Sequence, residues 1–230
     1  MAPSAIPFDE ASHRPRELTH GELEQVLDAW EAAARRALAA GFRVVEVHAA
    51  HGYLLHEFLS PRSNRRGDAF GGDLAGRMRF PLEVVRRVRA AWPDELPLLV
   101  RISVSEWAPG GFEPAEAVAF ARELKALGVD LVDCSSGGNA AEQQIPAAPG
   151  YQVPFAEQVR REAGIATGAV GLITEPAQAE EIVAGGRADA VLLARELLRD
   201  PRWPLRAAQA LGAELAWPDQ YLRAQPYRRP

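Results

Sequence analysis

The sequence lacks most of the features that mark a secreted, membrane-spanning or nucleic-acid-binding protein. Cys134 is the single cysteine among 230 residues, which excludes an intrachain disulfide framework and suits a reducing compartment. No run approaches the roughly 18 apolar residues of a membrane span, and the first residues have neither the basic region nor the apolar core of a signal peptide. A formal net charge of -5 gives no support to a nucleic-acid surface. We therefore expect a soluble, cytoplasmic protein with no membrane or nucleic-acid partner.

Apolar and polar residues instead follow a repeated helix-then-strand pattern, which we expect to form one domain, 1–230. The first helix is predicted to begin at Thr19, with Glu22 as its capping-box partner, and to end before Gly41. The flanking segments, 1–17 and 212–230, are expected to be an extended lead-in and a tail. Short, mostly apolar strands are expected at 42–48, 98–103, 130–134, 166–170 and 188–194. Further helices are expected at 76–92, 114–127, 154–163, 175–185 and 203–211.

Strands that are each preceded by an amphipathic helix predict an α/β fold in which helices cover a parallel sheet. A closed (β/α)₈ barrel needs eight strands and about 250 residues, whereas an open doubly wound sheet needs only about five strands. No Gly-x-Gly-x-x-Gly turn follows the first strand, which weighs against a dinucleotide-binding sheet. The pattern alone leaves a part of a barrel and an open sheet as alternatives.

Polar side chains gather where the predicted strands end, and ligands bind at these ends in both architectures. The first strand ends at His48, and His51 and Tyr53 follow within six residues. Two imidazole N–H groups suit an oxyanion, such as the enolate that forms when hydride adds to a conjugated carbonyl compound. The Tyr53 hydroxyl is suited to deliver a proton. The alternative interpretation is that both histidines are hydrogen-bonded core groups.

A metal site is a second alternative for the same residues. His48 and His51, together with a carboxylate such as Glu46 or Glu57, could ligate zinc or iron. No standard ligand spacing accompanies them, and only one cysteine is available. We therefore expect no metal.

Two further positions indicate an anionic ligand. Arg101 lies within an otherwise apolar strand, so either a carboxylate partner or an anion such as a reduced flavin must compensate its charge. Gly171 and Arg195 follow the last two strands, where barrels commonly bind phosphate. The alternatives are an internal salt bridge for Arg101, and a tight turn with a surface arginine at the other two positions. Cys134 is expected to be inert.

The motifs around these residues resemble the old yellow enzyme family, and its bacterial thermophilic-like NADPH dehydrogenases most of all. The resemblance extends over essentially the whole chain, and its most specific motif is Glu46-Val-His-Ala-Ala-His-Gly-Tyr-Leu-Leu-His-Glu-Phe-Leu-Ser-Pro61. Further matching segments are Ser63-Asn-Arg-Arg-Gly-Asp68, Phe70-Gly-Gly72, Asp130-Leu-Val-Asp-Cys-Ser-Ser136, Ala166-Thr-Gly-Ala-Val-Gly171 and Arg195-Glu-Leu-Leu-Arg-Asp-Pro201.

The resemblance implies FMN at the mouth of a (β/α)₈ barrel, NADPH as reductant, and an enone, enal or related activated alkene as hydride acceptor. It implies that the segment His48, Ala49, Ala50, His51 binds the substrate and that Tyr53 is the proton donor. Arg101 would face the flavin N1/O2 edge, and Gly171, Ala194 and Arg195 would hold its phosphate. Arg223 matches a C-terminal arginine that reaches into the neighbouring subunit's site, which implies that it binds substrate there and that the protein is a homo-oligomer.

The chain also departs from the family pattern, because eight strands would require on the order of a hundred more residues before Met1. We therefore expect an incomplete barrel with about five of the eight strands. Two alternative functions follow from this departure. The chain could be a catalytically incompetent barrel piece that acts only in assembly or interaction, or a flavin-free metal lyase on the same scaffold.

Overall fold

Five parallel strands form one sheet in the computed structural model, which describes residues 1–225. Adjacent strands follow one another in the chain, in the order β1 to β5, so the strand order does not reverse as it does in a doubly wound sheet. This sequential strand order favours part of a barrel over an open doubly wound sheet. The strands are β1 Val45–Ala49, β2 Leu98–Ser103, β3 Leu131–Ser135, β4 Ala166–Val170 and β5 Ala190–Leu192.

The first and last strands are shorter than the sequence predicted. The predicted strand 42–48 begins only at Val45, and the predicted strand 188–194 forms a ladder only over Ala190–Leu192. The reason is that a strand extends only where a neighbour offers partners: Val45 pairs with the first residue of β2, and β5 has β4 on one side alone. The predicted central strands agree with the structure to within one residue.

The predicted helices are present, with ends that differ by at most two residues, and three helical segments were not predicted. The helices are α1 His20–Ala39, α2 Leu54–Leu59, α3 Leu74–Ala91, α4 Pro114–Ala126, α5 Val153–Ala163, α6 Pro176–Ala184, α7 Arg195–Arg199 and α8 Trp203–Ala210, with a 3₁₀ helix η1 at Asp219–Ala224. The capping box of Thr19 and Glu22 is confirmed at the start of α1. The unpredicted segments α2, α7 and η1 have five or six residues, too few to show a helical period in the sequence.

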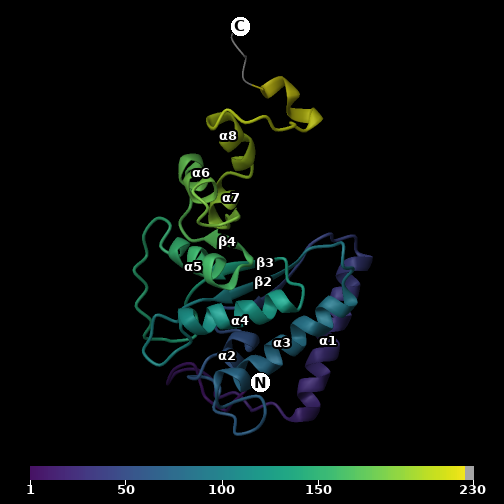
Figure 1. Cartoon of the computed structure of the whole chain (residues 1–230), viewed down its shortest axis with the longest axis vertical. Helices are drawn as coiled ribbons and strands as arrows, with labels where there is room; N and C mark the ends of the chain where they lie inside the picture. The colour runs from purple at the N-terminus through teal and green to yellow at the C-terminus, as the bar shows by residue number, and fades with distance from the viewer. Residues whose placement is uncertain (226–230) are drawn as a thin grey trace.

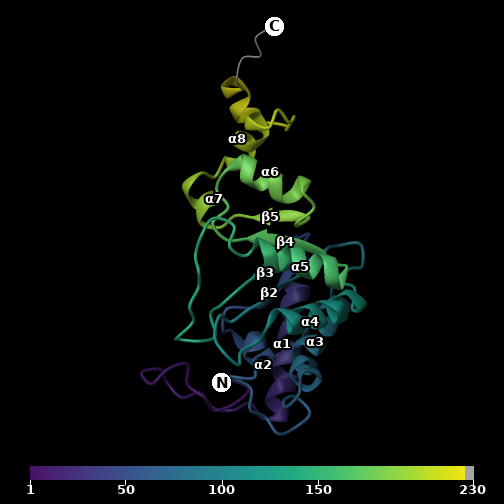
Figure 2. The same ribbon diagram turned by 60° about the vertical axis from the view of Figure 1, so that its left-hand side comes forward.

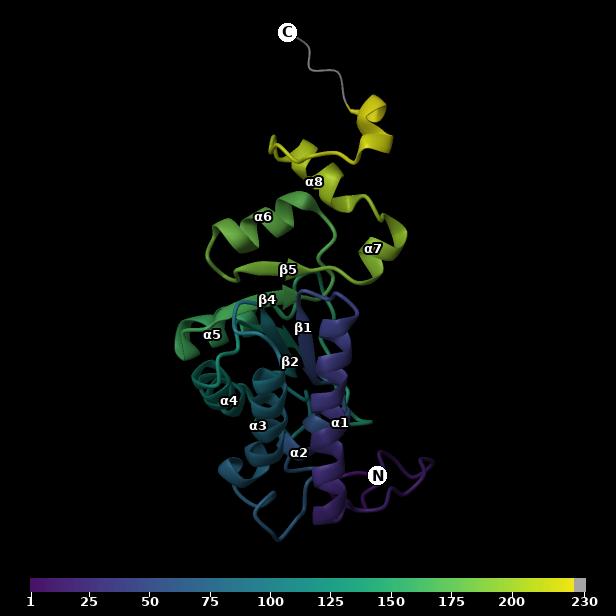
Figure 3. The same cartoon turned by 90° about the vertical axis from the view of Figure 1, so that its right-hand side faces the viewer.

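Within residues 1–225, helices cover one face of the sheet and no helix packs on the other, which is called the bare face. Figure 3 shows α3, α4 and α5 side by side along the covered face. Val47, Val100 and Val132 point to this face and are at most 1% exposed. Their neighbours along the strands alternate to the opposite face, where Glu46 is exposed and Arg101 is half-buried. In a barrel this second face is the interior.

Both edges of the sheet are unpaired within residues 1–225, and large apolar side chains lie exposed beside them. Phe42 and Val44 precede β1 with exposures of 61% and 49%, and Leu198 follows β5 with 83%. The edges of a closed barrel would be paired, so this distribution agrees with an incomplete barrel. Beyond β5, α8 and η1 extend away from the sheet (Figures 1 and 2). None of the helices over the described residues is both long and apolar enough to span a membrane.

A buried arginine, Arg66, helps to bind the N-terminal lead-in to the body of the chain. Arg66 donates hydrogen bonds to the carbonyl oxygens of Pro3 and Leu18, and it pairs with Asp68. A backbone bridge also joins Ala2 to Glu17. These contacts hold the two ends of the lead-in in place without a regular element. Of the predicted tail 212–230, residues 226–230 lie outside the described residues.

Candidate active site

The aromatic rings of His48, His51 and Tyr53 lie together at the carboxyl end of β1. The His48 ring centroid is 5.1 Å from that of His51 and 5.3 Å from that of Tyr53. His48 belongs to the bare face of the sheet, because its neighbours Val47 and Ala49 are buried on the helix side. Tyr53 is the residue before α2 and is 64% exposed. The predicted proximity of the three side chains is therefore confirmed.

A left-handed turn brings the His51 ring toward this group. His51 has φ +58° and Gly52 has φ +74°, a conformation that is costly for a residue with a side chain. The His51 amide donates to Ser103 Oγ at 3.0 Å, and its Nε2 lies 2.7 Å from Ser135 Oγ. The ends of β1, β2 and β3 thus hold one histidine from three sides.

Ala49 and Ala50, predicted to bind substrate, have buried side chains. They are 1% and 0% exposed, and Ala49 points to the helix layer. A contribution of either residue to ligand binding would have to come from the backbone.

Burial keeps both histidines of this group neutral. Burial and the nearby Arg101 cation lower the pKa of His51 to about 4, and the same causes lower the pKa of His48. At pH 7 each imidazole therefore offers one N–H donor and one lone pair. Neutral donors suit an oxygen that gains negative charge only during the reaction.

Arg101 lies beside His48 in the sheet and pairs with a buried carboxylate. His48, Arg101 and Asp133 occupy one row across β1, β2 and β3. Arg101 Nε lies 3.3 Å from Asp133 Oδ2, which confirms the internal-pair alternative, yet the Arg101 side chain is still 23% exposed on the bare face. Among residues 1–225 its guanidinium has no second ion pair or hydrogen bond. The outer part of Arg101 is therefore open to a further anion.

Asp133 is only partly compensated by Arg101. Burial raises its pKa to about 7, although Arg101 lowers it, and Glu46 on the neighbouring strand raises it further. Both carboxylate oxygens are buried and lack hydrogen-bond partners in the described part of the chain.

Cys134, predicted to be inert, is buried on the covered face, and burial raises the pKa of its thiol.

Gly171, Ala194 and Arg195 follow the adjacent strands β4 and β5. Gly171 has φ +117°, and a Cβ there would crowd the side chains of Tyr151 and Gln152, so only glycine fits without strain. Ala194 and Arg195 are exposed at the start of α7. Arg195 forms no ion pair or hydrogen bond within residues 1–225. The three predicted phosphate-binding residues therefore lie at the ends of neighbouring strands. Within residues 1–225, the guanidinium of Arg195 is free to bind a ligand.

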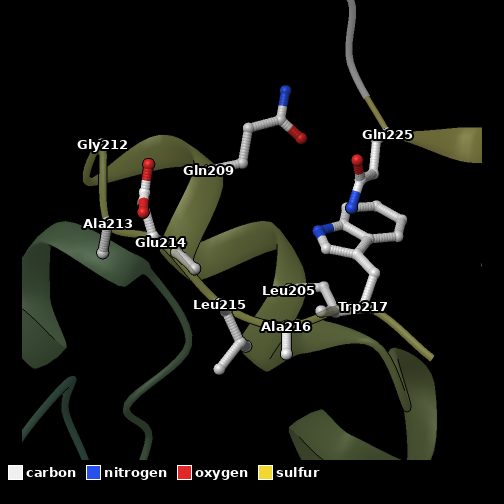
Figure 4. A pocket seen from close by; sticks show the side chains of 10 residues that line it. Leu205, Gln209, Gly212, Ala213, Glu214, Leu215, Ala216, Trp217 and Gln225 are labelled. Atoms are coloured by element: carbon white, nitrogen blue, oxygen red, sulfur yellow. The ribbon is translucent and has the colours of Figure 1, made fainter. Parts of the chain in front are cut away.

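Arg223 does not join this group in the described chain. It lies in η1, beyond α8, on the segment that extends away from the sheet (Figure 1). A pocket on that segment lies between α8 and the residues that follow it (Figure 4). Its lining residues are Leu205, Ala208, Gln209, Gly212, Ala213, Glu214, Leu215, Ala216, Trp217 and Gln225, none of which is a predicted site residue.

Several residues that support the site were not predicted. Ser135 and Asp133 stood at a predicted strand end, and this position was the signal that could have identified them. Gln152 gave no such signal, although it accepts from the Ser136 hydroxyl and donates to the Val170 carbonyl at 2.8 Å. Glu106 is 1% exposed and lies in the loop after β2.

No group of three or more His, Cys, Asp or Glu side chains suited to hold a metal ion occurs within residues 1–225.

Comparison with known proteins confirms the resemblance seen in the sequence. The profile described as "NADH:flavin oxidoreductase / NADH oxidase family" matches residues 1–214. An NADPH dehydrogenase of Geobacillus thermodenitrificans is 53% identical over 223 residues, which are 97% of this chain and 65% of that protein. This chain thus spans about two thirds of the length of that relative.

Solved structures show the same relationship. Morphinone reductase in complex with tetrahydroNAD is 29% identical with a TM-score of 0.75, over 95% of this chain and 61% of that one. The old yellow enzyme homologue from Zymomonas mobilis is 26% identical with a TM-score of 0.74, over 94% of this chain and 62% of that one. The predicted fold class, an incomplete (β/α)₈ barrel, is thereby confirmed.

Proposed function

This chain belongs to the NADH:flavin oxidoreductase / NADH oxidase family, and on that premise we propose that it is part of an FMN-dependent, NADPH-oxidising enzyme. We further propose that the acceptor is the activated C=C bond of an α,β-unsaturated carbonyl compound. The observation that carries this proposal is the group of neutral His48 and His51 beside Tyr53, with Arg101 in register next to His48.

The residues present fit a part of the FMN molecule. Arg101 is held by Asp133 through Nε, so its outer nitrogens are free for the anionic pyrimidine edge of a reduced flavin. Burial raises the pKa of Asp133 to about 7, so this carboxyl is partly protonated at neutral pH and leaves part of the Arg101 charge for an anionic ligand. Gly171 holds the end of β4 in a conformation that only glycine adopts without strain, and Arg195 supplies a free forked donor for a phosphate. Bound FMN would supply hydride transfer between NADPH and the substrate carbon.

The protein side chains would act on the carbonyl oxygen and on the proton. When hydride adds to the carbon β to a carbonyl group, negative charge develops on the carbonyl oxygen. His48 and His51 are neutral donors on one side of the site and would stabilise that charge by hydrogen bonds. Tyr53 is exposed beside them and would deliver the proton that completes reduction of the double bond.

A visible spectrum of the purified chain with added FMN tests the proposal. We expect bound flavin absorbance that NADPH bleaches and that 2-cyclohexenone restores. A double variant, His48→Ala with His51→Ala, should still bind FMN and be bleached, but should recolour at least about a hundredfold more slowly, as expected for lost oxyanion donors.

The unpaired strand edges favour a second candidate, a barrel piece without its own activity. A chain that folds but retains no FMN after gel filtration would support this candidate and contradict the first. Loss of activity on addition of a chelator would instead support the metal alternative.

A further inference from the structure

His56 is a fully buried histidine that the proposed chemistry does not use. It lies on α2, one turn after the His51–Gly52 turn, and its side chain is 0% exposed. Its Nδ1 accepts the Gly52 amide N–H at 2.9 Å, and its Nε2 lies 3.1 Å from Glu106 Oε1. The Gly52 amide makes no other hydrogen bond within residues 1–225. One imidazole thus connects the turn that carries His51 to a buried carboxylate on a different loop.

Glu106 joins this connection to the loop after β3. Its side chain is also 0% exposed, and its Oε1 accepts from Asn139 Nδ2 at 3.2 Å. Although burial raises the pKa of Glu106, hydrogen bonds from His56, Ser60 and Asn139 leave it below its usual value. The carboxylate is therefore ionised at neutral pH, and it holds together loops that follow β1, β2 and β3.

These contacts determine the protonation of His56. An Nδ1 atom that accepts an amide hydrogen carries no proton of its own. The ring proton must then lie on Nε2, which is 3.1 Å from Oε1 of the ionised Glu106, a close contact without hydrogen-bond geometry. A proton on Nδ1 would direct two donors at each other and release the Gly52 amide. The hydrogen bond from the Gly52 amide therefore fixes the tautomer of His56.

The turn needs this support because both of its residues are left-handed. Gly138 packs directly against it, so that a Cβ on Gly52 would overlap the Gly138 carbonyl and a Cβ on Gly138 would overlap His51. A turn in this conformation persists only where its surroundings hold it. The His51 ring follows the turn, since the backbone of His51 and its ring are both fixed by strand-end serines, Ser103 and Ser135.

We propose that His56, backed by Glu106, is a positioning residue that holds the His51–Gly52 turn and so aims the His51 ring at the substrate. The inference rests on the proposed function for the role of His51, but the contact with Gly52 is independent of it. His56 acts through the backbone and touches neither substrate nor cofactor.

Two variants of His56 separate its contacts with Gly52 and Glu106, because each variant keeps only one of them. His56→Asn places an amide oxygen where Nδ1 accepts from Gly52 and gives up the reach to Glu106. His56→Gln reaches Glu106 and gives up the acceptor for Gly52. Both introduce an amide into the same buried site, so similar losses of stability are expected. His13→Asn, at an exposed histidine, controls for the substitution itself.

Nuclear magnetic resonance of the chain without flavin gives the first measurement. Ring nitrogen shifts should show His56 protonated at Nε2 only, and the Gly52 amide should exchange slowly in the wild type and in His56→Asn. In His56→Gln its exchange should be about tenfold faster, the factor that corresponds to one lost hydrogen bond. A proton on Nδ1, or equal exchange in the two variants, would overturn the inference.

Enone kinetics of the FMN-loaded chain give the second measurement. KM should rise about tenfold in His56→Gln, stay within about threefold in His56→Asn and not change in His13→Asn. Equal KM values in the two His56 variants would overturn the positioning role even if both are destabilised. A wild type without enone activity, but with a protected Gly52 amide, would overturn the proposed function and leave the support of the turn by His56 standing.

Discussion

The Nε2 atom of His51 lies 2.7 Å from the hydroxyl oxygen of Ser135, a residue 84 positions further along the chain. Because β1 and β3 flank β2 in one sheet, the two strand ends meet. This hydrogen bond occupies one nitrogen of a neutral imidazole and leaves the other for a ligand. Ser135 thus decides which nitrogen of His51 is available.

Ser135→Ala should weaken substrate binding. The substitution removes the partner of His51 Nε2 and frees the ring to rotate, so KM for an enone should rise about fivefold, equivalent to about 1 kcal/mol. Steady-state kinetics measure this change. Ser136→Ala is the matched control, because Ser136 bonds Trp107 and Gln152 and not His51. An equal rise in KM in both variants would contradict a specific role of Ser135.

Arg195→Ala should reduce the preference for FMN over riboflavin. If Arg195 holds the phosphate, the loss of its charge-assisted hydrogen bonds should weaken FMN binding about tenfold to a hundredfold, and riboflavin binding should not change. Fluorescence titrations with both flavins measure the ratio of Kd values. Arg199→Ala, at the other end of α7, removes an exposed arginine that pairs with Glu196 and should leave the ratio unchanged. A phosphate site elsewhere would leave Arg195→Ala indistinguishable from that control.

Asp133→Asn should change how stability depends on pH. The pKa of Asp133 is raised from 3.8 to about 7, so between these values the folded chain keeps a proton that the unfolded chain releases. This group therefore makes the chain less stable as the pH rises from about 4 to about 7. His51, whose pKa is lowered to about 4, has the opposite effect between about pH 4 and 6.5.

The difference in unfolding free energy between the wild type and Asp133→Asn isolates the contribution of Asp133 to the pH dependence. The variant should gain stability relative to the wild type as the pH rises through this range, by an amount on the order of a few kcal/mol. Urea unfolding at several pH values, without flavin, measures it. A difference that does not vary with pH would show that Asp133 is ionised throughout.

Phe80→Ala should destabilise the helix layer. Phe80 is 0% exposed and its ring lies 4.5 Å from that of Phe58, centroid to centroid, so truncation should cost about 3–5 kcal/mol of unfolding free energy. Urea unfolding monitored by circular dichroism measures the loss. Leu198→Ala, at a side chain that is 83% exposed, should change stability by no more than about 0.5 kcal/mol. Similar losses in both variants would mean that Leu198 is covered in solution.

The local elements were predictable because their causes lie close together in the chain. The Thr19 and Glu22 side chains that cap α1 are three residues apart, and β4 was predicted with its observed ends, Ala166–Val170. The helix α2 was missed, since six residues show no clear period and the preceding motif resembled a loop. The group of His48, His51 and Tyr53 was predictable for the same local reason, because all three lie within six residues.

The sequence by itself therefore determined the order and type of the main elements, the motif at the end of β1 and the family. Only the tertiary structure decided that the strands run in sequential order, that Asp133 compensates Arg101, and that Ser135 and Glu106 support His51 and His56. The physical reason is that capping and periodicity depend on neighbours in the chain, whereas burial, charge compensation and hydrogen bonding between strand ends depend on residues that meet only after the sheet has formed.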